Sequence, residues 1–268
     1  MMLEETFGSY TDFIINKIDE YSPIKRKRDY DTRYCLKYVL KVLKCNIPWK
    51  YIESKAHYTT IYKRFLCWKR DNVFDKIWKD CLAIYSQEQF VKNKDWANVL
   101  IIDSTMIKNN AGVDGTGYNH FDRNRQATKQ SIICDENQVP LSCSFYPANI
   151  SDVKTIDKSI EQLSCKFRLD DSICTSIIAD SGYLIKQANQ EDILTRCNVK
   201  FIAHPRRKMK KQLSKEDSLK FKNRYKIEGL FCRLDKFARL RSRCDRKLDN
   251  YVSFNFMAMI ILTIKKLS

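Results

Sequence analysis

Hydrophobic residues follow helical spacing through the first third of the chain. From Leu3 to Gln89 they recur every three or four residues, with breaks near residues 22–23, 46–48 and 56–57. Runs that alternate between hydrophobic and polar residues, which would indicate strands, are rare in this region. The pattern predicts an all-helical domain over residues 1–95.

Inside this domain the pattern predicts two helices separated by a short turn. Pro48–Ser54 forms the first helix, Lys55–Tyr58 the turn, and Thr59 caps the second helix. Lys63 and Arg64 fall near the exposed face of the second helix. This layout is typical of a helix-turn-helix in which both residues contact DNA, although any small helical bundle produces the same pattern.

After Trp96 the period of the hydrophobic residues changes to that of strands. An apolar run comes first, two alternating runs follow with hairpin residues at 135–138 between them, and two short buried runs come later. The five predicted strands are Asn98–Asp103, Thr128–Cys134, Val139–Tyr146, Ser176–Ala179 and Val199–Ala203.

Helical spacing returns between and after the later strands. The predicted helices are Asp152–Leu163 with Ser151 as its cap, Leu184–Cys197, Lys220–Arg243 and Tyr251–Lys266, and His204–Leu219 is predicted as a loop. The resulting order βββαβαβα predicts a second domain of the α/β class over residues 96–268, with a five-stranded sheet flanked by helices.

Three features bear on where the protein acts. The apolar stretch Phe254–Ile264 is shorter than the roughly 20 residues that a membrane span needs, so it predicts a core helix. The first ten residues include Glu4 and Glu5 and do not resemble a secretion leader. The eleven cysteines contain no CxxC pair and are predicted to be buried thiols. We therefore expect an intracellular protein that is neither secreted nor bound to a membrane.

The charge of the chain favours a polyanionic partner. It has 49 Lys and Arg against 32 Asp and Glu, a formal net charge of +17. Such a surface binds nucleic acid by releasing condensed counterions, whereas membrane binding would call for an anchor or a basic amphipathic helix. The run Lys25–Arg28 could contact phosphates, act as a nuclear signal or simply be solvated. We expect the protein to reside with DNA in a nucleoid or a nucleus.

Three acidic residues carry the candidate chemistry. Asp103 and Asp180 each follow an apolar strand, and Glu228 lies on a helix at the edge of its hydrophobic face. Each has a structural alternative, since Asp180 begins a turn-like segment and Glu228 stands four residues after Arg224. Together, carboxylates about 4 Å apart would repel by roughly 4 kcal/mol per pair, so their convergence predicts a site for Mg²⁺ or Mn²⁺.

Several segments resemble the DDE-type transposases of insertion sequences, in the insertion sequence 5 group, which is related to the insertion sequence 4 group. They are LIIDST at Asp103, NRQATKQSIICDENQVPLSCSFYPANISD ending at Asp152, IIADSGY at Asp180 and RYKIEGLFCRLDKFARLRSR beginning at Arg224. In the helical domain, CNIPWKYIESK and TTIYKRFLCWKR resemble that group's DNA-binding region. The resemblance covers nearly the whole chain.

The resemblance implies a ribonuclease H-like catalytic domain with a mixed sheet. It implies a DNA transposase that cleaves and rejoins double-stranded DNA at terminal inverted repeats, with two Mg²⁺ ions and as a homodimer on DNA. Asp103, Asp180 and Glu228 match the family's triad residue by residue. Asp103 would bridge the two ions, and Asp180 and Glu228 would each complete one site.

Basic residues near the triad are expected to contact DNA, with two departures from the family pattern. Arg224 matches the arginine of the signature Y-x2-R-x3-E-x6-K and would bind a phosphate, and Lys129 is a further candidate. Phe221 replaces the signature tyrosine. Asp235 stands in place of the lysine and Lys236 follows it, rotated by about 100° on a helix.

Two alternatives to the transposase stay open. The replacement of the signature lysine by Asp235 is compatible with a domesticated or degenerate DNA-binding factor that has lost strand transfer. A metal-dependent nuclease that cleaves without rejoining is the other. The residues around the triad, namely Ser104, Thr128, Asn149 and Asp152, are expected either to support it or to serve as turn and cap residues.

Overall fold

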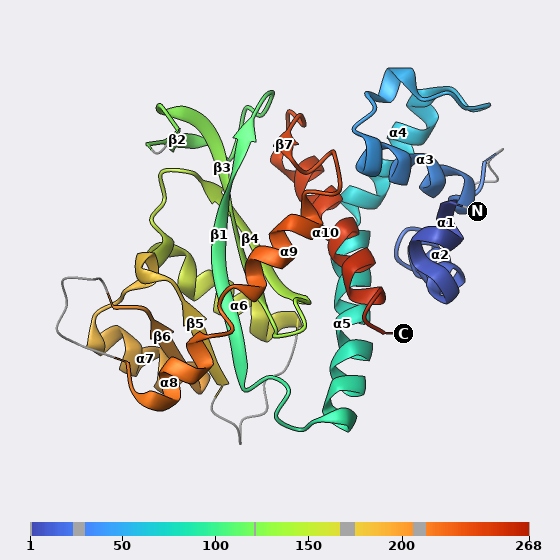
Figure 1. The fold of residues 1–268 in the computed structure, drawn as a ribbon. Coiled ribbons are helices and arrows are strands. Elements are labelled where there is room, and N and C mark those ends of the chain that lie inside the picture. Colours follow the sequence, from blue (N-terminus) through green and yellow to red (C-terminus); the bar gives the residue numbers. More distant parts are fainter. Residues whose placement is uncertain (1, 24–29, 121, 167–174, 206–212, 268) are drawn as a thin grey trace. The chain divides into compact units, whose positions relative to one another are not determined.

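The computed structural model describes residues 2–23, 30–120, 122–166, 175–205 and 213–267 (Figure 1). The chain forms two compact units. The helical unit consists of residues 1–84, 108–114 and 233–268, and the sheet unit of residues 85–107 and 115–232. The division into domains 1–95 and 96–268 stays a prediction, since the helical unit also takes in two later segments of the chain.

The first third of the chain is helical, as the hydrophobic spacing predicts. Its elements are α1 (Met2–Phe7), η1 (Gly8–Tyr10), α2 (Thr11–Tyr21), α3 (Thr32–Cys45), η2 (Trp49–Tyr51), α4 (Tyr58–Arg70) and α5 (Val73–Lys92). In α3 the buried residues Leu36, Val39, Leu40 and Leu43 recur at intervals of three and four, so one stripe of the helix faces the core. Asp31 caps α3 by accepting a hydrogen bond from the backbone of Tyr34 at 2.6 Å.

The predicted helix Pro48–Ser54 is wrong. Only a single 3-10 turn forms there, η2, and the chain is extended at Ile52. Ile52 and Ala56 are buried, which favours an extended course that turns both side chains inward over a helix too short to sustain its own hydrogen bonds. The second helix begins at Tyr58 after His57, so Thr59 lies within α4 and does not cap it.

The C-terminal helix α10 (Leu248–Ile264) is the core helix that its composition predicts, starting three residues earlier than expected. Thirteen of its residues are buried, on all sides of the helix. Phe254 stacks on Phe65 of α4 with ring centroids 4.7 Å apart, and Phe256 stacks on Trp78 of α5 at 5.5 Å. Within the described part of the chain, no helix is long and apolar enough to cross a membrane.

The strands form one mixed sheet. They are β1 (Val99–Asn109), β2 (Gly117–Asn119), β3 (Arg125–Cys134), β4 (Pro140–Pro147), β5 (Thr175–Ala179), β6 (Val199–Ala203) and β7 (Ser242–Arg243). Neighbouring strands run in the order β4-β3-β1-β5-β6, with β2 beside β3 and β7 beside β1 (Figure 1). The five predicted strands are all present, and the α/β class with a mixed sheet flanked by helices is confirmed. The additional strands β2 and β7 are too short to show a period of two.

The hairpin between β3 and β4 is confirmed. The strands pair antiparallel from Thr128 opposite Pro147 to Cys134 opposite Pro140. In the connecting turn, Asp135 Oδ1 accepts a hydrogen bond from the backbone of Val139 at 2.8 Å, and Gln138 adopts a left-handed conformation with φ of 62°.

Helices pack on the sheet of the sheet unit. They are η3 (Asp152–Thr155), α6 (Ile156–Lys166), η4 (Ser181–Tyr183), α7 (Gln187–Cys197), α8 (Lys215–Phe221) and α9 (Lys226–Leu234). Helix α6 contacts β3 and β4, α7 contacts β6, and α8 contacts β5. The segment predicted as a loop, His204–Leu219, therefore contains the start of α8, and its residues 206–212 lie outside the described part.

The predicted continuous helix Lys220–Arg243 is wrong. It is interrupted by turns over residues 222–225, and α9 ends at Leu234. The side-chain amide of Asn223 donates a hydrogen bond to Glu136, and its backbone N–H donates to the carbonyl of Lys220 in a tight turn. Asn forms such local bonds readily and so competes with a continuous helix.

Candidate active site

The parallel pairing of β1 and β5 places Asp103 across from Asp180. Leu100 pairs with Ile177 and Ile101 with Ile178, an offset that leads to Asp103 and Asp180 two residues further on. Neighbouring strands lie about 4.8 Å apart, and residues in register point to the same face. Asp103 lies inside β1, which continues to Asn109, so the prediction that its strand ends there is wrong.

The carboxylate of Asp103 is largely buried and surrounded by negative charge. Its side chain is 23% exposed, and Oδ1 accepts a hydrogen bond from the backbone N–H of Ser104 at 2.8 Å. Burial, together with the nearby carboxylates of Asp180 and Asp152, raises the pKa of Asp103 to about 6 against the opposing effects of the Ser104 backbone and Arg224. The site therefore carries negative charge that a cation would relieve.

Asp180 begins the turn that follows β5, as its structural alternative predicts. Its Oδ1 accepts a hydrogen bond from the backbone N–H of Gly182 at 2.7 Å, which caps η4. A carboxylate has about four lone-pair positions on two oxygens, so this hydrogen bond leaves it able to bind a cation as well. The turn holds the carboxylate in place at the end of a buried strand.

Arg224 lies between Asp103 and Glu228. Its guanidinium is 3.7 Å from Oδ2 of Asp103 and 3.1 Å from Oε1 of Glu228. Glu228 is in the first turn of α9 with its side chain 60% exposed. The ion pair expected from a spacing of four residues is thus present, and the same arginine also reaches the first aspartate. One positive charge brings the two acids toward each other.

The donor set fits a divalent cation in its chemistry. Carboxylate oxygens are the ligands that Mg²⁺ and Mn²⁺ prefer. Burial and the neighbouring carboxylates both raise the pKa of Asp103, and a bound cation would offset the unfavourable charge. Among the described residues, no group of three or more His, Cys, Asp or Glu side chains is arranged to hold one metal ion. Glu228 would have to leave Arg224 to join the two aspartates.

The structure separates the two basic residues that α4 was predicted to present to DNA. Lys63 is exposed. Arg64 is 3% exposed, donates a hydrogen bond to Thr32 Oγ1 at 3.2 Å and lies 5.5 Å from the ring centre of Trp68. The prediction that Arg64 contacts DNA is therefore corrected: its side chain packs inside the helical unit, because its position on α4 faces α3.

Lys129 is likewise buried. Its side chain is 3% exposed and its ammonium lies 2.7 Å from Oδ1 of Asp152. Although it stands on β3 within a segment matched to the family, it faces the interior of the sheet unit, and the prediction of a DNA contact is corrected to an internal ion pair. Lys236 is exposed and follows the end of α9. The helical rotation argued for Lys236 does not apply, since α9 ends at Leu234.

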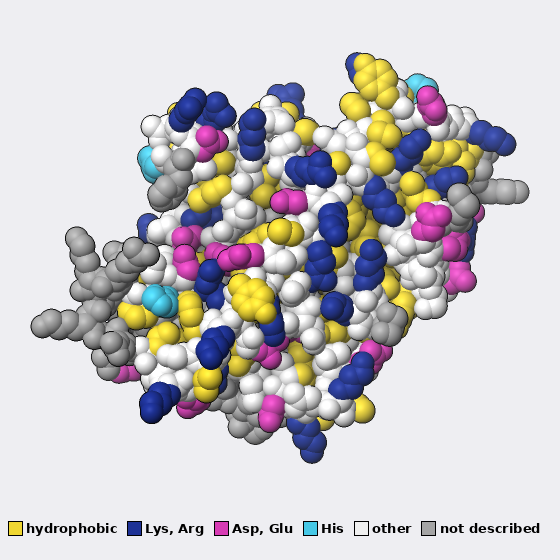
Figure 2. Space-filling model, viewed as in Figure 1, with side chains coloured by type: hydrophobic (Ala, Val, Ile, Leu, Met, Phe, Trp, Pro, Cys, Tyr) yellow, Lys and Arg dark blue, Asp and Glu magenta, His cyan; other side chains and the backbone are white. Residues whose placement is uncertain are grey.

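Two further predictions concern the cysteines and the basic run near residue 25. Of the cysteines in the described part, Cys35, Cys81, Cys134 and Cys143 are buried, whereas Cys45 and Cys232 are exposed, so the prediction of buried thiols is only partly right. Residues 24–29, which include the basic run Lys25–Arg28, lie outside the described residues. Lys and Arg side chains are spread over much of the face seen in Figure 2, interspersed with acidic and apolar ones.

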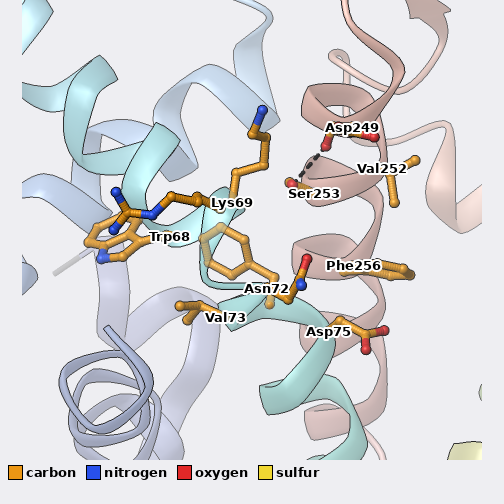
Figure 3. Close-up of a pocket in the computed structure, with 11 residues that line it drawn as sticks. Trp68, Lys69, Asn72, Val73, Asp75, Asp249, Val252, Ser253 and Phe256 are labelled. Atoms are coloured by element: carbon orange, nitrogen blue, oxygen red, sulfur yellow. Dashed lines mark hydrogen bonds between the residues drawn. The ribbon is translucent and has the colours of Figure 1, made fainter. Parts of the chain in front are cut away.

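A cavity of about 370 Å³ lies within the helical unit (Figure 3). The end of α4, the start of α5 and α10 line it, with Trp68, Val73 and Phe256 on its apolar side and Asp75 and Asp249 among its charged residues. None of the predicted triad residues lines this cavity. The catalytic chemistry expected from the sequence is therefore not located there.

Sequence reasoning did not single out Tyr183. Its side chain is 1% exposed, and its hydroxyl donates a hydrogen bond to Ser104 Oγ at 3.1 Å, next to Asp103. Burial raises the pKa of Tyr183, so the phenol stays protonated and acts as a donor. The available signal was its place three residues after Asp180, in the turn that follows a buried strand.

The chain matches one protein-family model and several solved structures. The sequence model described as "Transposase DDE domain" matches residues 97–263, more than half of the chain, and no curated protein matches. A piggyBac transposase synaptic complex with hairpin DNA is 10% identical, covering 99% of this chain and 73% of that one, with a TM-score of 0.45. The catalytic domain of Mos1 mariner transposase is 8% identical, covering 63% and 91%, with a TM-score of 0.30. Because the family match spans most of the sheet-forming sequence, the chain belongs to the transposase DDE domain family and is a DNA transposase.

Proposed function

We propose that this transposase cleaves DNA at terminal inverted repeats and joins the freed ends to target DNA, using Asp103, Asp180 and Glu228 as its catalytic acids. The observation that carries the proposal is the half-buried carboxyl group of Asp103, whose pKa is raised to about 6 by burial and by the neighbouring carboxylates of Asp180 and Asp152, in a chain of this family. Asp180 is included because the register of β1 and β5 places it across from Asp103. Glu228 is included because Arg224 contacts both it and Asp103.

DDE transposases depend on divalent metal ions, and we propose Mg²⁺ or Mn²⁺ for this one. When bound, such ions activate the attacking oxygen and stabilise the departing 3′ oxygen of the phosphodiester. Asp103 and Asp180 would hold the cations from two stiff, adjacent strands, and Glu228 would complete the set from α9. The strands contribute rigidity, because both are buried between neighbours in the sheet.

Arg224 is proposed to exchange partners during the reaction. In the structure it neutralises Asp103 and Glu228. Its guanidinium offers paired donors that suit a phosphate group, so a DNA phosphate entering the site would take it over from Glu228. Glu228 would then be released toward the aspartates. This exchange would couple DNA binding to completion of the metal site.

The finer assignments follow from the quoted sequence segments and from the charge. We place the chain in the insertion sequence 5 group, acting with DNA inside the cell, on double-stranded element ends and target DNA and as a homodimer. Two neighbours of known structure, a pre-cleavage Mos1 transpososome and a Mos1 strand transfer complex, are each 10% identical over 90% of this chain with TM-scores of 0.30. Lys63 and Lys236, both exposed, are the proposed DNA contacts that remain.

The proposal is tested by nicking of supercoiled plasmid DNA with Mg²⁺ or Mn²⁺. Asp103→Asn, Asp180→Asn and Glu228→Gln should each abolish nicking, while the matched variant Asp217→Asn, which loses an ion pair with Lys200 in the same unit, should retain it. Nicking that survives in any triad variant, or that proceeds equally with a chelator present, would rule out the proposed site.

A DNA-binding factor without strand transfer is the second candidate, favoured by Asp235. This residue replaces the signature lysine and is exposed just past the end of α9. A duplex with a terminal inverted repeat separates the possibilities: joining to target DNA identifies the transposase reaction, cleavage without joining identifies a nuclease, and salt-sensitive binding alone identifies the factor. Asp235→Lys should increase joining if the missing lysine limits it.

A further inference from the structure

Asp152, whose side chain is 30% exposed, is at the centre of a partly buried hydrogen-bond network in the sheet unit. Its Oδ1 accepts hydrogen bonds from Lys129 Nζ at 2.7 Å and from Ser104 Oγ at 2.6 Å. Ser104 in turn accepts one from the hydroxyl of Tyr183 at 3.1 Å. Lys129 and Tyr183 are 3% and 1% exposed. The hydrogen-bond network thereby connects β3, η3, β1 and η4.

This hydrogen-bond network reaches Asp103, the first proposed catalytic aspartate, through Ser104. Ser104, whose hydroxyl holds Asp152, directly follows Asp103 on β1. The backbone N–H of the same serine donates to Oδ1 of Asp103 at 2.8 Å. A shift of Asp152 would therefore be passed to Ser104 and, through one peptide unit, to the carboxylate of Asp103.

The other side of Asp152 faces the turn that fixes the second aspartate. A Cβ atom on Gly182 would stand 3.0 Å from Oδ2 of Asp152 and 3.0 Å from Oδ1 of Asp180, so the two carboxylates approach the same glycine. The backbone N–H of Gly182 donates to Asp180 at 2.7 Å. Segments η3 and η4 also contact each other directly. Asp152 thus lies against both elements that hold the two aspartates.

Lys129 keeps Asp152 in this place. An unpaired buried ammonium or carboxylate is costly, so the ion pair ties the position of one partner to that of the other. The two hydrogen bonds both engage Oδ1, and Oδ2 faces Gly182. Oδ1 of Asp152 is therefore held from β3 and from β1 at once.

We propose that Asp152, anchored by Lys129 and Ser104, is a positioning residue that sets the separation of Asp103 and Asp180 and so their joint affinity for a divalent cation. The inference rests on the proposed function, since it assumes that these two aspartates bind the cation. A contribution to folding alone would lower stability but would leave cation binding by the folded protein unchanged.

The test is a titration of the full-length, DNA-free protein with Mn²⁺, in which free Mn²⁺ is measured by electron paramagnetic resonance. Asp152→Asn should weaken Mn²⁺ binding by roughly 10- to 100-fold, as the loss of groups that orient metal ligands does elsewhere. Circular dichroism establishes that the variant is folded at the temperature used. Asp217→Asn, which also loses a lysine partner in the sheet unit, should bind Mn²⁺ like the wild type.

Ser104→Ala provides a second route if Asp152→Asn does not fold. It keeps the ion pair of Lys129 with Asp152 and removes the link to β1, together with the acceptor of the Tyr183 hydroxyl, so Mn²⁺ binding should again weaken. Wild-type binding that Asp103→Asn abolishes but that both of these variants keep within about twofold would overturn the positioning role alone. Mn²⁺ binding that is absent, or indifferent to Asp103→Asn, would instead overturn the proposed metal site and this inference with it.

Discussion

At the scale of single residues, the surroundings of Asp103 disfavour the ionised form of its carboxyl group. The carboxyl group is mostly buried, and burial together with the charges of Asp180 and Asp152 raises its pKa to about 6. At neutral pH it is ionised despite that environment. Groups with such shifts gather at functional sites, where binding a ligand relieves the unfavourable charge.

This shift predicts a pH-dependent stability in metal-free buffer. Because the folded pKa of about 6 lies above the unfolded value near 3.9, the carboxyl group contributes its full stability below about pH 4 and loses it as pH rises through 6. Asp103→Asn should therefore raise the free energy of unfolding at pH 7.5 by at most about 3 kcal/mol and have little effect at pH 4. Urea denaturation with a chelator present measures both.

Asp217 supplies the control of opposite sign. Burial alone would raise its pKa, but Lys200, whose ammonium donates a hydrogen bond at 2.6 Å, acts together with Ser214 and Lys220 to lower it. Its stabilising contribution is thus present at neutral pH and is lost in acid. Asp217→Asn should destabilise the protein at pH 7.5. If Asp103→Asn also destabilised the protein at pH 7.5, the conclusion that the ionised Asp103 is unfavourable in the folded protein would be wrong.

At the scale of elements, α4 is held to its neighbours by a residue that sequence alone assigns to its surface. Arg64 donates a hydrogen bond to Thr32 at the start of α3, lies 3.7 Å from Asp19 of α2 and stacks against Trp68 of its own helix. Thr32 donates to the same aspartate at 2.5 Å. The arginine therefore joins three helices of the helical unit.

We expect Arg64→Met to destabilise the protein by roughly 1–3 kcal/mol, since it removes buried hydrogen bonds to a charged group. The adjacent Lys63→Met, on the exposed side of α4, should change stability by less than about 0.5 kcal/mol and instead weaken DNA binding. Chemical denaturation and fluorescence anisotropy with labelled duplex DNA measure the two effects. Equal destabilisation by both variants would contradict the separation of roles.

At the scale of the whole molecule, the net charge of +17 dictates how DNA binding depends on salt. If the chain neutralises about six phosphates or more, affinity should fall by about 10³-fold between 50 and 200 mM salt. Asp103→Asn should show the same slope, because it alters the proposed metal site and not the proposed phosphate contacts. A salt-independent affinity would mean that the positive charge is not used to bind DNA.

The same basic composition could not reveal which charges are available to a partner. Lys63 and Arg64 are neighbours with the same charge, yet one is exposed and the other is inside the helical unit. Lys129 looks like a DNA contact until the residue 23 positions later, Asp152, is found beside it. Side-chain partners of this kind come from distant segments, and no local pattern records them.

Helix limits were predicted least well where a contact with a distant segment interrupts a helical pattern. The strands β1, β3, β4, β5 and β6 follow hydrophobic runs and were all foreseen. The break at residues 222–225 was not, because it depends on the side chain of Asn223 meeting Glu136 far away in sequence. Propensity favours a continuous helix there, and a tertiary contact overrides it.

By itself the sequence determined the order of the five main strands and the basic character of the chain, because periodicity and residue type are local properties, and it singled out the three acids that we propose as catalytic. Only the tertiary structure decided that Asp103 and Asp180 share a register, that Arg224 lies between Asp103 and Glu228, and that Lys129 is bound internally. These arrangements depend on which segments pair across the sheet, and pairing minimises the free energy of the folded chain as a whole.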